Sequence, residues 1–187
     1  MDQVAARPYA ARDGSPDVAL NCAKTLRDLD PENAQCAATL PRLPAARCRI
    51  CAVPLGGALV CPDCYRRPPP FEAVHAPSRH DGLARELVHR LKYRRARHLA
   101  PTLGAAMAAA LGPGPPPTLV VAVPLHPARR SERGFNQSEL LAAEVAARLG
   151  RPLGDALERV RPTAAQTGLS PAERAVNVRG AFRARAD

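Results

Sequence analysis

The chain has 187 residues, enough for one ordinary domain with a buried core and a small appendage, and its 3% aromatic content without tryptophan means that Leu, Val and Ala must form that core. Its formal net charge of +10 indicates attraction to polyanions such as nucleic acid, nucleotides, phosphorylated sugars or an anionic membrane, the alternative being an arginine-rich surface that only confers solubility. Because no apolar run is long enough to cross a membrane or to open a secretory signal, we expect a cytoplasmic protein without a membrane span.

Residues 1–47 are polar, rich in scattered prolines and poorly periodic. This composition predicts a poorly ordered N-terminal extension, with at most a short helix over residues 22–29. An over-long assignment of the gene start is an alternative for this segment. Cys22 and Cys36 lie here without a CxxC partner, which favours free thiols.

Residues 48–66 carry two CxxC pairs, Cys48 with Cys51 and Cys61 with Cys64. Each pair can present two thiolates from a tight turn, and two pairs complete a tetrahedral sulfur site. A redox dithiol is the alternative, but it needs only one pair and a thioredoxin-like context that is missing here. We therefore expect a closed, structural Zn²⁺ site that supplies folding free energy to a module with little apolar area.

A basic, proline-rich linker over residues 66–70 separates this module from a predicted α/β domain at 71–187. Apolar spacing predicts helices over 82–95 and 101–111. The first helix carries a basic run in which Lys92, Tyr93, Arg94 and Arg95 are nucleic-acid candidates, because cationic and aromatic groups suit phosphate and base. The alternative is a solvated helix face, and the sequence leaves the two interpretations open.

An apolar run over 118–123 predicts a central parallel strand covered by helices on both faces. A basic turn follows, and then a helix capped by Asn136 and ended by Gly150. The carboxyl end of such a strand is where α/β folds bind anionic ligands. We therefore expect the following residues to bind a phosphate-bearing anion: Arg129, Arg130, Arg133 and Gly134.

Residues 157–183 predict a basic loop or hairpin with weak strands at 157–160 and 176–182. Its polar residues Arg161, Gln166, Arg174 and Asn177 are candidates for a flexible flap over a charged substrate. A plain surface connection is an equal alternative.

Five segments resemble, in order, the ComF family of phosphoribosyltransferase-like proteins. They are the two CxxC pairs, RELVHRLKY (85–93), VPLHPARRSERGFNQ (123–137), RVRPTAAQTGLS (159–170) and ERAVNVRGAF (173–182). The resemblance implies a zinc knuckle joined to a type I phosphoribosyltransferase-like α/β domain, and a link to natural competence, DNA uptake and transformation. It also implies that Arg129, Arg130 and Arg133 lie on the pyrophosphate side of the site and that residues 159–179 form a flexible hood.

One family feature is missing from the chain. Members of this fold hold phosphoribosyl pyrophosphate with an acidic pair followed by small hydroxyl residues and glycine, and no such motif occurs here. We therefore expect a chain truncated before that loop, marginally stable and without turnover, in which no catalytic residue is assigned and Mg²⁺ is needed only with a complete transferase site. The hypotheses are a phosphoribosyltransferase-like protein, a zinc-stabilised basic module that binds single-stranded DNA or competence and recombination proteins, and a non-functional remnant.

Overall fold

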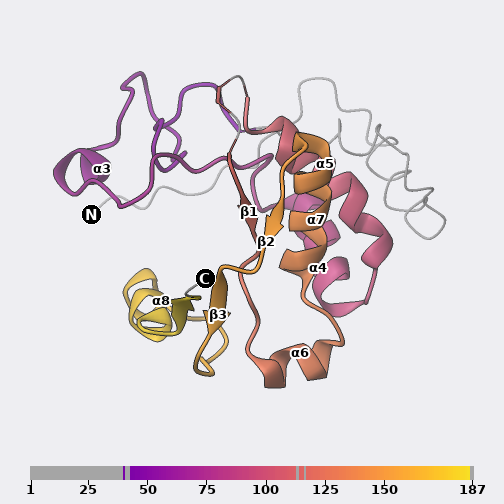
Figure 1. The fold of residues 1–187 in the computed structure, drawn as a ribbon. Coiled ribbons are helices and arrows are strands. Elements are labelled where there is room, and N and C mark those ends of the chain that lie inside the picture. Colours follow the sequence, from indigo (N-terminus) through magenta and orange to yellow (C-terminus); the bar gives the residue numbers. More distant parts are fainter. Residues whose placement is uncertain (1–39, 41–42, 113, 116, 186–187) are drawn as a thin grey trace.

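A computed structural model describes residues 40, 43–112, 114–115 and 117–185 (Figure 1). The described chain is a mixed α/β structure that contains helices and two short, two-stranded sheets. The possible helix over residues 22–29, together with Cys22 and Cys36, lies outside these residues. In the described part, every helix is too short or too polar to cross a bilayer.

The cysteine-rich segment forms a small unit with its own core. Helix α3 (Pro62–Arg66) begins directly after Cys61, whose sulfur accepts a hydrogen bond from the amide of Cys64. The buried sulfur-bearing side chains pack against Ile50, Leu55 and Val60. The amide of Val74 donates to the carbonyl of Ile50 at 2.7 Å, so the chain that leaves this unit folds back onto it.

The main core lies between helices, as their apolar spacing predicts. Helix α4 (Gly82–Tyr93) is followed by the 3-10 helix η1 (Arg97–Leu99) and by α5 (Ala100–Ala109). Helix α4 ends two residues earlier than expected because Arg95 takes a left-handed φ of 55°, which a helix cannot continue through. The core cluster consists of Leu40, Ala84, Leu87, Leu91, Leu99, Leu103 and Phe135.

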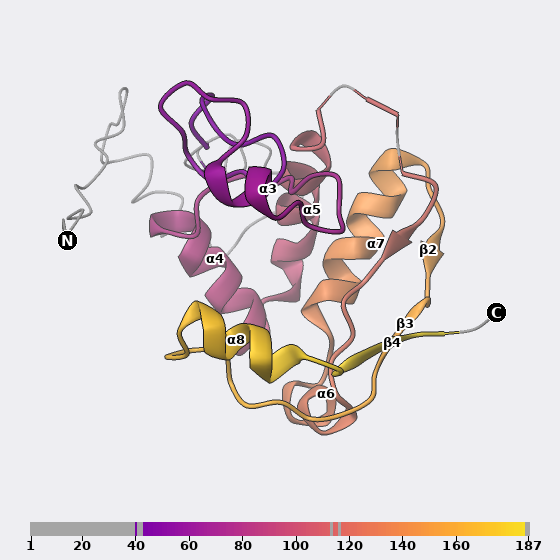
Figure 2. The same ribbon diagram turned by 90° about the vertical axis from the view of Figure 1, so that its left-hand side faces the viewer.

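Helix α7 (Gln137–Leu149) packs closely on α5, as both views show (Figure 2). The two helices meet at Gly104, where an added Cβ would lie 2.3 Å from the Cβ of Glu144. The ends of α7 confirm the prediction: the Asn136 side chain caps its first turn and Gly150 ends it with a φ of 61°.

The predicted parallel strand is present but short. Strand β1 (Val120–Val121) pairs with β2 (Leu153–Gly154) in parallel register. Pairing ends after two residues: Pro152, which has no amide proton, precedes β2, and the chain leaves the strand conformation at Asp155. The expectation of a strand covered on both faces is wrong for the described chain, since Leu119 and Val123 on either side of β1 are exposed.

Two segments for which no helix is predicted are helical. Residues of the basic turn form α6 (Pro127–Arg133), and the predicted strand over 176–182 is replaced in its first part by α8 (Pro171–Val178). Both helices begin with proline, and Ser170 and Glu173 form a capping box at the start of α8. Strands β3 (Leu157–Arg159) and β4 (Phe182–Ala184) then pair antiparallel around α8, which confirms the hairpin interpretation.

Candidate functional site

The arginines that follow β1 are carried by α6 rather than by a turn. The chain leaves β1 through Pro124, His126 caps α6 with its ring nitrogen, and Gly134 ends the helix with a φ of 79°. Gly134 therefore meets a conformational requirement of the helix end, and an added Cβ would approach only the side chain of Arg97. These local rules place the arginines beyond the carboxyl end of the parallel strands.

Two anchors fix the position of the loop between α6 and α7. The side chain of Asn136 is 1% exposed, and its amide nitrogen donates to the carbonyl of Val123 at 3.1 Å. Arg97 donates to the carbonyl of Gly134 at 3.1 Å, and its guanidinium lies over the ring of Phe135. Arg97, the first residue of η1, is thus a structural arginine, which composition alone did not indicate.

The three arginines predicted to bind an anion have different interaction partners. Arg130 forms an ion pair with Glu139 at 2.5 Å. Arg133 donates to Gln137 and lies over the ring of Tyr93, 5.3 Å from its centroid. Arg129 forms a looser ion pair, 3.8 Å long, with the exposed carboxylate of Glu132. The structure therefore separates Arg130 from the other two.

A cavity of about 440 Å³ joins three segments that are distant in sequence, and we call it the basic cleft. The end of α4 contributes Lys92 and Tyr93, α6 contributes Arg129 and Arg133, and the end of β3 contributes Arg159. Polar groups complete the wall. The remaining lining residues are Leu125, His126, Ala128, Glu132 and residues 162–167.

The cations of the basic cleft are close enough to perturb one another. Burial, and then the charge of Arg133, lower the pKa of Lys92 below its usual 10.5. Burial also lowers the pKa of Arg159, with further contributions from Arg129 and Arg161. Like charges held together in this way are relieved by an anion, so the cleft is electrostatically suited to bind one.

The remaining nucleic-acid candidates lie at the edge of this cleft. Arg95 lines a smaller cavity of about 230 Å³ together with Lys92, Tyr93, Arg129, Glu132 and Arg133. Arg94 is exposed and lines neither cavity. The structure thus brings Lys92, Tyr93 and Arg95 together with the arginines of α6.

The predicted flap is internally bonded. The side chain of Asn177 both donates to and accepts from the backbone of Ala164, at 3.0 and 3.2 Å. Arg161 donates to the carbonyls of Asn177 and Arg179, and Arg174 donates to that of Gln166. Of the four flap candidates, Gln166 alone lines the basic cleft, while the others hold the segment in shape.

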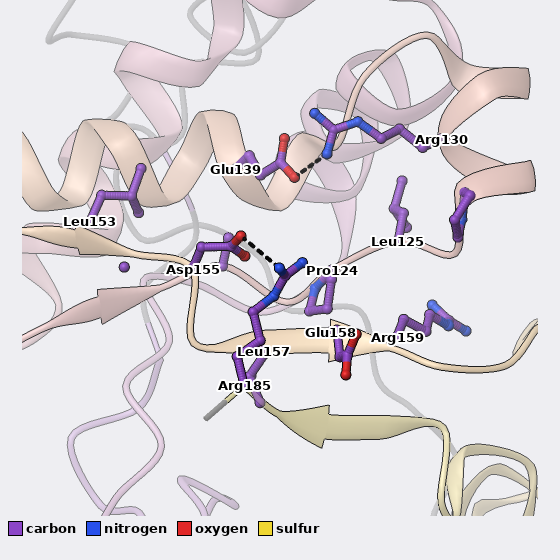
Figure 3. Close-up of a pocket in the computed structure, with 13 residues that line it drawn as sticks. Pro124, Leu125, Arg130, Glu139, Leu153, Asp155, Leu157, Glu158, Arg159 and Arg185 are labelled. Atoms are coloured by element: carbon purple, nitrogen blue, oxygen red, sulfur yellow. Dashed lines mark hydrogen bonds and ion pairs between the residues drawn. The ribbon is translucent and has the colours of Figure 1, made fainter. Parts of the chain in front are cut away.

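A second cavity of about 580 Å³ opens at the carboxyl ends of β1 and β2 (Figure 3). Its charged residues are mostly paired: Arg130 with Glu139, and Arg185 with Asp155 at 3.5 Å. Glu158 forms a further ion pair with Arg183 at 2.6 Å. This strand-end cavity therefore has as many carboxylates as guanidinium groups, whereas in the basic cleft four cations face one carboxylate, that of Glu132.

The four CxxC cysteines converge as predicted. Their sulfur atoms lie within 4.8 Å of one another, and those of Cys51 and Cys61 are 3.7 Å apart. Tetrahedral zinc with bonds of about 2.3 Å needs sulfur atoms roughly 3.8 Å apart, so the cluster can hold such a metal. The amide of Cys61 also donates to the sulfur of Cys48, which stabilises a thiolate there.

The metal-free thiols differ in acidity. The backbone amide of Cys51 lowers the pKa of Cys48 to about 6, whereas burial raises the pKa of Cys64 to about 12. Cys48 therefore loses its proton more readily than Cys64. Metal binding must displace the Cys64 proton, so metal affinity falls as the pH falls.

Comparisons with known proteins agree with the resemblance seen in the sequence. The chain is 36% identical over 144 residues to the DNA utilization protein YhgH of Salmonella typhi, and 31% identical over 144 residues to that of Escherichia coli K12. Each match covers 73% of this chain and 63% of the relative, so the chain spans somewhat less than two thirds of these proteins. A stretch of 67 residues, 35% of this chain, is 37% identical to competence protein F of Haemophilus influenzae, of which it covers 29%. No family model and no solved structure matches the chain.

Proposed function

Because this chain is a homologue of DNA utilization and competence proteins of the ComF family, we propose that it binds single-stranded DNA in the basic cleft during DNA uptake. The observation that carries the proposal is the convergence of Lys92, Tyr93, Arg129 and Arg133 on one cavity. The names of the relatives supply the biological setting, and the chemistry of the cleft supplies the ligand. A cytoplasmic location and contact with competence or recombination proteins belong to the same proposal.

The charges of the cleft favour a phosphate backbone. Lys92 and Arg159 have lowered pKa values because they are partly buried beside other cations. A phosphate placed among them removes this repulsion and accepts hydrogen bonds from guanidinium groups. Among the described residues, the one carboxylate paired with Arg129 is that of exposed Glu132 at 3.8 Å, so binding breaks no strong ion pair there.

The aromatic residue favours a single strand over a duplex. Tyr93 is 58% exposed, and Arg133 lies over its ring. Unpaired bases can stack on tyrosine or on a guanidinium plane, whereas the bases of a duplex are already stacked. A pair of this kind beside phosphate-binding cations is the usual combination in sequence-tolerant single-strand binders.

In our proposal, the four-cysteine cluster is a structural zinc site that supports this function. Four thiolates leave no open position for a substrate, so a bound zinc ion would act on folding rather than on chemistry. We propose that residues 48–66 form a zinc-folded module, that 71–187 form a phosphoribosyltransferase-like domain, and that the segment 1–47 precedes both, with its described residue Leu40 packed in the helical core.

A phosphoribosyl pyrophosphate-like anion is the second candidate ligand. It is supported by the cavity at the carboxyl ends of two parallel strands, the position where α/β folds bind phosphate esters. The paired state of Arg130 argues against it, because Glu139 already occupies that guanidinium. Transfer of a phosphoribosyl group would further need Mg²⁺ and a ribose site.

Fluorescence anisotropy with a labelled thymidine oligonucleotide tests the main proposal. We expect binding at low salt that weakens steeply as salt rises, with a slope of about 0.7 per phosphate contact. The double variant Arg129→Gln/Arg133→Gln should weaken binding and reduce that slope by roughly 1.4. Arg151→Gln, which removes an exposed charge at the other end of α7, is the matched control.

Two outcomes would contradict the proposal. Absence of binding at low salt, or an unchanged slope in the double variant, would show that the basic cleft is not the DNA site. Phosphoribosyl pyrophosphate added as a competitor separates the two candidate ligands. Release of pyrophosphate from it by the purified chain would establish the transferase function instead.

A further inference from the structure

The module that carries the cysteine cluster presents an unusual surface. Tyr65 is 80% exposed and Phe71 is 47% exposed, although the described chain has very few aromatic residues with which to build a core. Arg66 and Arg67 lie between them in sequence and are also exposed. We call the residues Tyr65, Arg66, Arg67 and Phe71 the module patch.

The patch borders a depression of about 450 Å³ lined by Asp63, Cys64, Arg66, Arg67, Pro69 and Phe71. Within the described residues, neither Arg66 nor Arg67 forms a side-chain ion pair or hydrogen bond. Exposed aromatic groups beside free guanidinium groups form the combination that binds unpaired bases and their phosphates. A protein without such a ligand usually buries most of the area of its aromatic rings instead.

A metal bound to the four cysteines would contribute to the charge of this surface. A zinc ion with four thiolates has two positive and four negative charges, and so a formal charge of −2. Arg66 and Arg67 follow Cys64 closely in sequence and offset that charge where the patch meets solvent. Stacking on Tyr65 and Phe71 therefore contributes more to binding here than net charge does.

Helix α3 of the module lies on the same side of the molecule as helix α8. Helix α3 carries Tyr65 and Arg66, and α8 belongs to the flap. Both helices lie on the left in Figure 1 and face the viewer in Figure 2, with α3 above α8. A strand that leaves the cleft past residues 162–167 can continue over this face toward α3.

We infer that the module patch is a second contact surface for single-stranded DNA, which extends the path of a strand bound in the basic cleft. The inference rests on the proposed function in one respect, namely that the ligand is single-stranded DNA. It assigns to the cysteine module a binding role in addition to its folding role. Two linked contact surfaces predict an affinity that grows with strand length, because the second contact becomes intramolecular.

Oligonucleotide length distinguishes one contact surface from two. We would measure anisotropy with thymidine strands of about 6 and about 30 nucleotides, lengths below and above a typical single binding site. The variant Tyr65→Ser/Phe71→Ser should bind the long strand at least about fivefold more weakly, and should lose most of the gain from length. Leu59→Ser is the matched control, because Leu59 is 74% exposed in the same module.

A second variant guards against loss of the fold. Arg66→Gln/Arg67→Gln changes only exposed side chains and should reduce the salt slope for the long strand by about 1.4. Metal content is measured for every variant. If both patch variants keep their metal and show the full gain from length, the inference is overturned. A patch that binds an acidic protein instead of DNA would give this same result.

The two proposals fail separately. Weaker binding in the patch variants, with no change in Arg129→Gln/Arg133→Gln, would remove the basic cleft from the DNA path and leave the module patch in place. The reverse result would keep the proposed function and overturn the second surface.

Discussion

Asn136 shows how a single buried residue can position a functional loop. It caps α7 through a hydrogen bond from the amide of Ser138, and its own amide donates to Val123 and to Glu139. The carbonyl of Val123 lies just beyond β1, so this one side chain joins the strand to the helix that follows the arginines. The position of the loop therefore depends on both the oxygen and the nitrogen of the Asn136 side-chain amide.

We expect Asn136→Ala to lower the free energy of unfolding by about 1–2 kcal/mol, because it removes a helix cap and the part-buried hydrogen bond to the carbonyl of Val123. Asn136→Ser retains a cap oxygen but not the donor, and should have about half the effect. Urea denaturation measures both. Equal stability of the alanine variant and the parent would show that the loop is held by other contacts.

Lys92 provides a prediction about pH. Its pKa in the free protein lies below 10.5 because of burial and Arg133, and a bound phosphate would raise it again. Affinity for DNA should therefore be full below the free-state pKa and decline as the pH rises from there toward the pKa in the complex. Lys92→Arg, which stays charged, should shift this decline to higher pH, as anisotropy at fixed ionic strength can measure.

At the scale of elements, the contact between α5 and α7 depends on glycine. Ala at position 104 would favour the helix by up to about 1 kcal/mol, but its Cβ would lie 2.3 Å from that of Glu144. Since both atoms belong to packed helices, the clash is relieved only by moving them apart. Gly104 is therefore required by packing and not by backbone conformation.

We expect Gly104→Ala to destabilise the protein by about 1–3 kcal/mol, the usual cost of overpacking. Glu144→Gly, which removes the opposing Cβ, should rescue part of that loss when the two changes are combined. Thermal or urea unfolding of the four proteins gives the coupling energy. Purely additive effects would mean that the helices do not meet at this contact.

The elements also show how far sequence reasoning reaches. Apolar spacing and end residues predicted α4, α5 and α7, because these helices are long enough for a period to be seen. Helices α6 and α8 have only 7 and 8 residues and no buried face, so they are too short for a helical period to be recognised in the sequence. Their proline starts, and the Ser170 capping box, were the available signals.

At the scale of the whole molecule, the arginines after β1 were predictable as a group, but their partners were not. Arg130 and Arg133 are three residues apart on α6 and face different cavities. That separation depends on Glu139 from α7 and Tyr93 from α4, which only tertiary packing brings near. The cysteine cluster was predictable because its spacing is local.

The whole molecule should also respond to the metal in a specific way. The cysteine unit has a core made mainly of Cys48, Cys61 and Cys64, so removal of a bound zinc ion would take away the bonds that hold this core together. The helical core of Leu87, Leu91 and other residues is separate from it. We expect a chelator to unfold the module first and to leave most of the helical circular dichroism signal.

Hydrogen exchange resolves the two parts, with loss of protection expected for residues 46–67 and retention in α4, α5 and α7. Cys64→Ser should reproduce the effect of the chelator and lower the metal content. Cys36→Ser, at a predicted free thiol, is the control that should leave the metal content unchanged. Simultaneous loss of protection in both parts would show that the module and the helical core fold as one cooperative unit, a coupling that the hydrogen bond from Val74 to Ile50 could transmit.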